Sequence, residues 1–377
     1  MRGVLLLLLP VLGGSVLSYF GVARIAVGHA ESAPVGANLT NEPYKLTPAE
    51  QETMLGAIEQ AGVHVIRASI PPDDAGIEFA QRAEAHGIKI EFLLWLYPVA
   101  GTKWPHAPAG FSGLWRGYPL SMSDPERFRG YLTPLLAKLE DKGITLAGFE
   151  LGNEINWAGF NADFTLPGQG RVLGADDLVN DPEGQQVAKG YLAYLKTMAV
   201  LKDIRDHSKL NRDTPIISGG LADLSVSTWT HTKRADAVDV TATWNFMRAH
   251  GLDDLVDGYG LHLYPHTGDS GKIRTHLEQN GLDECQAAGT PGGKPCWITE
   301  WGADGAGAGC PVDDSARIVQ VKAMRSQYDP LVRVGRIAAL MFYDWQGNLH
   351  ATNEDHASAF RCGSLTESGR LAIAPLR

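Results

Sequence analysis

Two glutamates carry the clearest chemical signal in the sequence. Glu154 ends the motif Gly152-Asn153-Glu154, Glu300 stands in Thr299-Glu300-Trp301, and each follows an apolar run that predicts a buried strand. A pair of carboxyl groups can cleave an acetal: one gives a proton to the leaving oxygen, and the other, ionised, attacks or shields the anomeric carbon. The pair therefore raises glycoside hydrolysis as a hypothesis, provided that the fold brings together two residues 146 positions apart.

Further polar side chains stand where other predicted strands end, namely Arg67, His262 and Tyr264. An arginine within about 4–6 Å would keep one carboxyl ionised, and the resulting negative charge would favour protonation of the other. A single glutamate at a strand end is more often a solvated or salt-bridged rim residue. The catalytic hypothesis therefore depends on Arg67, Glu154, His262 and Glu300 acting together.

A repeated unit of apolar run and amphipathic segment predicts the elements that position these residues. Helical patterns lie over 48–61, 75–86, 124–142, 183–207 and 314–328. Eight strands are expected, at 34–39, 63–70, 89–96, 146–152, 215–219, 258–263, 294–299 and 336–343.

Eight alternations indicate an α/β protein, either a closed (β/α)8 barrel or a doubly wound open sheet. An open sheet would be expected to carry a glycine-rich phosphate turn after its first strand, and Val35-Gly36-Ala37-Asn38 does not match that pattern. In a barrel, functional groups gather at the carboxyl ends of the strands, where these residues stand. We expect a single-domain (β/α)8 TIM barrel over 31–350, with 351–377 as a C-terminal extension packed on it.

These motifs resemble the signature of the clan A retaining glycoside hydrolases, which are (β/α)8 proteins. The resemblance rests on Gly152-Asn153-Glu154 and on Trp297-Ile298-Thr299-Glu300-Trp301-Gly302. It extends in order to Arg67, to the H-x-Y of His262 and Tyr264, and to Trp345, and it spans about residues 33–350. Families five and thirty-nine are the most similar.

The resemblance implies roles for the site residues. Glu154 would be the general acid/base and Glu300 the nucleophile, with Asn153 bonded to the sugar 2-hydroxyl. Arg67 and Tyr264 would hold Glu300 ionised and oriented. A transglycosylase, or a carbohydrate-binding barrel without catalysis, is the alternative.

Two departures limit the match to the clan and leave the sugar open. Ile155 follows Glu154 where several families have Pro, and Trp95-Leu96-Tyr97 ends strand three where the cellulase-like family has a His.

Aromatic residues at the same edge could bind the faces of sugar rings. By the resemblance, Trp345 would stack under the sugar next to the scissile bond. Segments 98–123 and 155–182 are too long for simple connectors and are expected to form cleft walls. Trp95 and Trp157 are expected to contact substrate, and Trp104, Trp115 or Trp157 could form platforms, although packing of these loops on themselves explains any one of them equally well.

The composition limits which binding partners and which cellular location are expected for the protein. The formal charge is −10 and no Lys/Arg cluster is present, which disfavours binding of nucleic acid. A carbohydrate substrate is the expected partner, and the protein is expected to be a monomer. Residues 1–30 hold a basic start, an apolar run and small residues, which predicts a signal peptide and a secreted or periplasmic protein. A retained N-terminal anchor is the alternative, and only then would a membrane be involved.

Four cysteines in an exported chain favour two disulfides. Three pairings are possible, and we favour Cys285 with Cys296 and Cys310 with Cys362. None of the four stands in a C-x-x-C pair, so a metal site is disfavoured. No metal or cofactor is expected elsewhere either, although His350, Asp355 and His356 form a His-Asp cluster.

Two tryptophans are expected to be structural. Trp244 lies in a helical segment, and Trp297 alternates out of phase with Glu300 and so should point toward the surrounding helices. No G-x-S-x-G occurs, which argues against a serine hydrolase.

Overall fold

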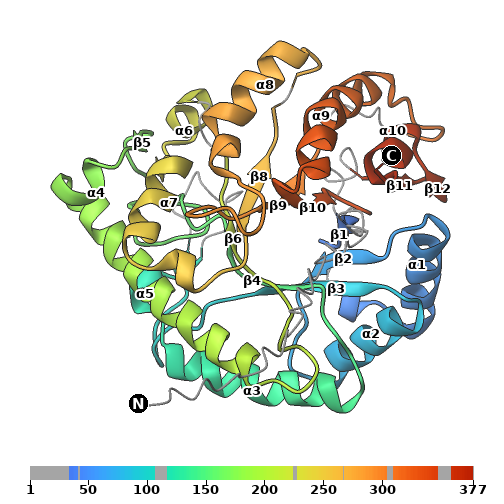
Figure 1. Cartoon of the computed structure of the whole chain (residues 1–377), viewed down its shortest axis with the longest axis horizontal. Helices are drawn as coiled ribbons and strands as arrows, with labels where there is room; N and C mark the ends of the chain where they lie inside the picture. Colours follow the sequence, from blue (N-terminus) through green and yellow to red (C-terminus); the bar gives the residue numbers. More distant parts are fainter. Residues whose placement is uncertain are drawn as a thin grey trace, which may run out of the picture. The chain divides into compact units, whose positions relative to one another are not determined.

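The computed structural model describes residues 34–40, 43–106, 117–223, 227–265, 267–303, 309–346 and 358–376. Within them, eight parallel strands form one sheet in the order β6-β4-β3-β2-β1-β10-β9-β8. Parallel bridges from Ile217 to Gly258 and from Leu221 to Leu261 join the two outer strands, β6 and β8, and close the sheet. Figure 1 shows the helices arranged around the strands. The expected (β/α)8 TIM barrel is confirmed.

The eight expected strands are all present. They are β1 (Val35–Asn38), β2 (Val65–Ala68), β3 (Lys89–Leu94), β4 (Gly148–Asn153), β6 (Ile216–Gly220), β8 (Tyr259–Leu263), β9 (Cys296–Trp301) and β10 (Ile337–Phe342). Two short pairs lie outside the barrel: β5 (Val172–Leu173) with β7 (Ala237–Val238), and β11 (Phe360–Arg361) with β12 (Ser364–Leu365).

The five expected helices are also present, with small differences at their ends. The helices of the described residues are α1 (Pro48–Gln60), α2 (Asp74–Ala85), α3 (Pro125–Asp141), α4 (Asp177–Asn180), α5 (Pro182–Asp206), α6 (Ser227–Lys233), α7 (Val240–Ala249), α8 (Ser270–Gln279), α9 (Ser315–Arg333) and α10 (Glu367–Ile373). None of them is both long and apolar enough to cross a membrane.

Helix starts follow directly from the sequence. In α1, α3 and α5 a capping residue precedes a proline, in Thr47-Pro48, Asp124-Pro125 and Asp181-Pro182. Each cap side chain accepts backbone N–H groups of the first turn, and the proline has no N–H to leave unpaired. Such a cap contributes about 1 kcal/mol.

The barrel interior is filled at its amino end by a small apolar cluster, and Trp297 belongs to it. The cluster comprises Val65, Ile217, Trp297, Ala339 and Met341. A Cβ on Gly148 of β4 would lie 3.5 Å from the Trp297 ring on β9. Since β4 and β9 are not neighbours in the sheet, their side chains meet only inside the barrel.

The expectation that Trp297 points toward the helices is therefore wrong, although the prediction that it is buried holds. The reason is an irregularity in β9: Leu261 pairs with Ile298, but His262 pairs with Glu300, so one residue of β9 is skipped. Because of this extra residue, the side chains of Thr299 and Glu300 both face the interior, and side chains no longer alternate between the two faces from Glu300 back to Trp297. Trp244 is buried on α7, as expected.

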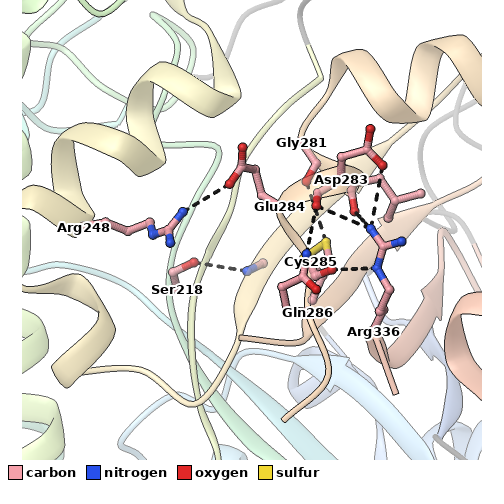
Figure 2. The surroundings of a disulfide bond; sticks show 11 residues. Ser218, Arg248, Gly281, Asp283, Glu284, Cys285, Gln286 and Arg336 are labelled. Carbon is pink, nitrogen blue, oxygen red and sulfur yellow. Dashed lines mark hydrogen bonds and ion pairs between the residues drawn. A yellow bond between two sulfur atoms is a disulfide. The ribbon is translucent and has the colours of Figure 1, made fainter. Parts of the chain in front are cut away.

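Both favoured disulfides are present, Cys285–Cys296 and Cys310–Cys362. Figure 2 shows the first, where Arg336 donates to the carbonyl oxygens of Cys285 (2.7 Å) and Leu282 (2.9 Å). Cys296 begins β9 at the end of the barrel opposite Glu300. This disulfide therefore secures the amino end of the strand that carries Glu300.

The C-terminal residues pack on the barrel through Arg317 of α9. Its guanidinium donates to Ser368 Oγ (2.7 Å), the Ser358 carbonyl (2.8 Å) and Thr366 Oγ1 (3.0 Å). The expected signal peptide at 1–30 and the cluster of His350, Asp355 and His356 lie outside the described residues.

Replacing Cys285 and Cys296 together by Ser is expected to lower the free energy of unfolding by about 2–3 kcal/mol, because a cross-link spanning 11 residues no longer restricts the unfolded chain. Urea denaturation followed by tryptophan fluorescence measures the change. An unfolding midpoint equal to that of the unmodified chain would contradict the structural role of this disulfide.

Candidate active site

Glu154 stands just beyond β4 in a left-handed turn. Gly152 has φ 82° and Glu154 itself has φ 47°, and the Glu154 N–H donates to the Gly220 carbonyl at 2.8 Å. A non-glycine residue in this region is strained, and such strain is concentrated at functional sites. Trp157 Nε1 donates to Glu154 Oε2 at 2.7 Å, and His262 Nδ1 lies 2.8 Å from Oε1. Both carboxylate oxygens are thus held.

Glu300 is held from two sides at the end of β9. Arg67 Nη1 donates to its Oε1 at 2.7 Å, and the Tyr264 hydroxyl donates to its Oε2 at 2.8 Å. Burial and the charge of Glu300 raise the pKa of Tyr264 well above its ordinary value, so this tyrosine remains a neutral donor. Two donors of this kind stabilise an ionised carboxylate.

Arg67 connects four strands through one buried guanidinium. Besides Glu300, it donates to Glu150 (Nε, 2.5 Å), Asn153 (Nη2, 2.7 Å) and Asn38 (Nη1, 2.9 Å). Burial opposes its charge, but the carboxylates of Glu150 and Glu300 outweigh that penalty and raise the pKa of Arg67 further above its ordinary value. The cation is therefore permanent and fixed in direction.

Glu150 and Asn38 hold the Arg67 arrangement together. Glu150 Oε1 accepts the Gly220 N–H at 2.8 Å and Thr299 Oγ1 at 3.0 Å, and Asn38 Nδ2 donates to the Thr299 carbonyl at 3.0 Å. Since Asn153 receives Arg67 at Oδ1, its Nδ2 has no protein partner among the described residues and is available to a ligand.

The two candidate catalytic carboxyls are close. One oxygen of Glu154, one oxygen of Glu300 and a ring nitrogen of His262 all lie within 4.8 Å of one another, which makes them the one trio of metal-ligand side chain types at such spacing among the described residues. His262 Nδ1 is 3.4 Å from Glu300 Oε2. Burial disfavours the imidazolium, yet the charges of Glu300 and Glu154 prevail and raise the pKa of His262.

A further acid, Glu91 on β3, lies buried inside the barrel next to Arg67, its register partner on β2. Neither of its carboxyl oxygens has a hydrogen-bond partner among the described residues. Burial, followed by the charge of Glu150, raises the pKa of Glu91 well above its ordinary value, and Arg67 only partly opposes this. Burial therefore favours the protonated, neutral form of Glu91.

The aromatic residues are placed differently from one another. Trp345 has no exposed surface and stacks on Phe360 with centroids 5.4 Å apart. Trp157 is also buried and serves as the hydrogen-bond donor to Glu154 rather than as an open platform. Unlike Trp345, Tyr343 is only half-buried, and its ring lies 6.1 Å from that of Tyr264, whose hydroxyl donates to Glu300.

A cavity of about 530 Å³ opens beside Asn153 between the segments after β3 and β4. Trp95 lies on it, is 37% exposed and donates from Nε1 to Ser69 Oγ at 3.1 Å. Trp104 is 41% exposed on the same cavity, while Trp115 lies outside the described residues. The cavity is also lined by Leu96, Tyr97, Pro98, Gly101, Thr102, Gly117, Tyr118, Pro119, Leu120, Ser123, Arg127, Gly152, Ile155 and Phe160.

Sequence reasoning missed Asn38, Glu91, Glu150 and Tyr343. A usable signal existed for two of them, because Glu91 and Glu150 are charged residues inside apolar strands, where only an interior function or a partner makes a charge tolerable. Nothing in the sequence distinguished Tyr343 from Trp345, two residues later.

No protein-family model matches the sequence, and no curated protein is similar to it. Solved structures share its fold. A monomeric β-xylosidase from Caulobacter crescentus CB15 superposes with a TM-score of 0.53 at 14% identity, covering 91% of this chain and 66% of the other. A family 39 glycoside hydrolase from the gut symbiont Bacteroides cellulosilyticus WH2 gives 0.51 at 16% identity, with 91% and 64% covered.

A β-galactosidase from the psychrophilic Marinomonas ef1 gives a TM-score of 0.52 at 10% identity, with 90% of this chain and 58% of the other covered. This chain therefore spans about two thirds or less of the length of these three enzymes. At such identities the similarity establishes the fold.

Gly220→Ala is expected to lower the free energy of unfolding by about 1–3 kcal/mol, because overpacking displaces neighbouring groups. A Cβ there would overlap His262 Nε2 and lie 2.5 Å from Thr299 Oγ1. Gly130→Ala on α3 is the control, since its Cβ meets nothing within 4 Å, and it should stabilise by about 0.5–1 kcal/mol. Urea denaturation compares the two variants, and equal effects would refute the close packing.

Glu154→Gln is expected to lower the pKa of His262, because it removes one of the two negative charges that favour the imidazolium. Because the folded-state pKa of His262 is raised, its stabilising contribution is complete below about pH 6.5 and disappears as the pH rises through the folded value. NMR titration of the imidazole measures the pKa, and a midpoint that rises in the variant would contradict this arrangement.

Proposed function

We propose that this protein is a retaining glycoside hydrolase acting on a β-linked oligo- or polysaccharide, with Glu300 as nucleophile and Glu154 as general acid/base. One observation carries the proposal: the two carboxyls lie on one rim with oxygens within 4.8 Å, each held by its own donors. Retaining enzymes have carboxyl groups about 5–5.5 Å apart, whereas inverting enzymes need about 6.5–9.5 Å to admit a water. The spacing favours retention.

The surroundings of the two carboxyls favour this division of roles. Glu300 touches a permanent cation, Arg67, and so suits the ionised nucleophile. Glu154 has no arginine or lysine partner among the ion pairs of the described residues and is held by Trp157 and His262. A carboxyl without a fixed cation can lose and regain a proton during a catalytic cycle.

The reaction then proceeds in two displacements. An oxygen of Glu300 forms a bond to the anomeric carbon while the bond to the leaving oxygen breaks, and Glu154 transfers its proton to that oxygen. In the second step Glu154 takes a proton from water, whose oxygen replaces Glu300 on the anomeric carbon. The Nδ2 of Asn153 is placed to donate to a sugar hydroxyl on this side of the ring.

We also propose that the protein is exported. The solved structures that share its fold agree with the proposed activity. The glycosidases among them act on β-xylosides and β-galactosides by their descriptions, which agrees with a β-linked substrate here. Both disulfides are of the kind that persists in an oxidising compartment, which supports a secreted or periplasmic location.

Incubation with activated 2-deoxy-2-fluoro-β-glycosides is expected to trap a glycosyl adduct on Glu300, which intact mass and peptide mapping detect. Glu154→Ala should lower kcat/KM by more than about 100-fold on substrates with poor leaving groups and far less on activated ones, because only the poor leaving groups need a proton. Added azide should restore its turnover by replacing water as nucleophile.

Glu300→Gln should form no adduct with any of the glycosides while remaining folded, which its circular dichroism spectrum checks. Labelling at another residue, or an equal loss for all leaving groups in Glu154→Ala, would refute the assigned roles. Hydrolysis that yields the inverted anomer by NMR would refute the double displacement.

A further inference from the structure

The cavity beside Asn153 differs in charge from the rest of the molecule. The chain has 43 acidic residues against 33 basic ones, yet the seventeen residues that line this cavity include no Asp or Glu. They include one cation, Arg127, together with the aromatic side chains of Trp95, Trp104 and Tyr118. The side chains that line this cavity therefore carry a formal charge opposite in sign to that of the whole chain.

Arg127, in the first turn of α3, is oriented toward this cavity without an acidic partner. Its Nη1 donates to the Pro98 carbonyl, and no carboxylate pairs with it among the ion pairs of the described residues. Arg129, two residues along the same helix, shows the usual alternative: it donates to Asp203 at 2.6 Å. The backbone contact fixes one arm of the Arg127 guanidinium and leaves further N–H donors for a ligand.

The sequence of the cavity wall has the same bias. The described residues of the segment after β3, 98–106 and 117–123, contain no Asp or Glu but include Lys103. Lys103 is exposed between Thr102 and Trp104, two residues that line the cavity. These residues therefore add one positive charge and no negative charge beside the cavity.

We propose that this cavity binds an anionic sugar residue, a uronate or a sulfated sugar, in the chain of the substrate next to the residue whose bond is cleaved. The aromatic rings would contact the apolar face of the sugar, and Arg127 would form charge-assisted hydrogen bonds to its carboxylate or sulfate. Asn153 belongs both to this cavity and to the catalytic centre, so a ligand here continues directly into the site. That the bound sugar is part of a substrate rests on the proposed function, whereas the binding of an anionic sugar by the cavity does not.

Binding separates this inference from catalysis. The Glu300→Gln chain is titrated calorimetrically with three matched sets of β-linked oligosaccharides: neutral, carrying glucuronic acid, and carrying sulfate. At least one anionic set should bind at least tenfold more tightly than the neutral set, and its affinity should fall as NaCl is raised. The set that binds identifies the anion as carboxylate or sulfate.

Arg127→Met in the same background should weaken binding of the anionic set at least tenfold and that of neutral sugars by less than twofold. Arg129→Met is the matched control, because it removes a cation from the same helix without touching the cavity, and it should change neither affinity by more than twofold. Equal affinity for neutral and anionic sets, no binding of any anionic set, or an anionic preference that survives Arg127→Met would overturn the inference. Adduct formation on Glu300 of the unmodified chain tests catalysis separately, so the failure of one proposal is distinguishable from failure of the other.

Discussion

The buried guanidinium of Arg67 is the constraint on which the site depends. A charge removed from water must be surrounded by partners, and here those partners come from β1, β4 and β9. Leaving any one unpaired would cost several kcal/mol, of the order found when a single member of a buried ion pair is removed. The direction of the Glu300 carboxylate is therefore set by the interior of the barrel, and the contacts that hold it rigidly are the same ones that make the barrel interior polar at this level.

Both candidate catalytic carboxyls reach the rim through departures from regular strand geometry. Glu154 follows a glycine into the left-handed region, and Glu300 follows the skipped residue in β9. A regular strand would send alternate side chains to opposite faces, so neither departure is compatible with an ideal strand continuing past the barrel. The strain and the irregularity cost some stability, and the hydrogen bonds to Gly220, His262 and Tyr264 stabilise the resulting positions.

Much of this architecture could be predicted from the sequence, because the barrel is encoded by local patterns. The eight apolar runs, the Asp-Pro and Thr-Pro helix starts and the order of Arg67, Glu154, His262 and Glu300 along the chain all depend on short stretches of sequence. The features that escaped prediction depend on contacts between distant strands. The inward direction of Trp297 requires knowledge of the irregularity beside it, and burial of Trp345 under Phe360 depends on the path of the chain after β10. Glu91 and Glu150 stand out in the sequence as charges inside apolar strands, but their position next to Arg67 depends on how β2, β3 and β4 pair.

Glu91 has a consequence for the acid–base behaviour of the whole fold. Burial raises the pKa of Glu91, so its carboxyl is protonated in the folded chain at pH values where it is ionised in the unfolded chain. At pH values above the ordinary pKa of glutamic acid, folding is therefore coupled to the uptake of a proton. Between the unfolded and folded pKa values of such a group, stability falls by about 1.4 kcal/mol for each unit of rising pH. The barrel thus carries within it an intrinsic preference for acidic surroundings, set by a residue that makes no hydrogen bond to any of the described groups.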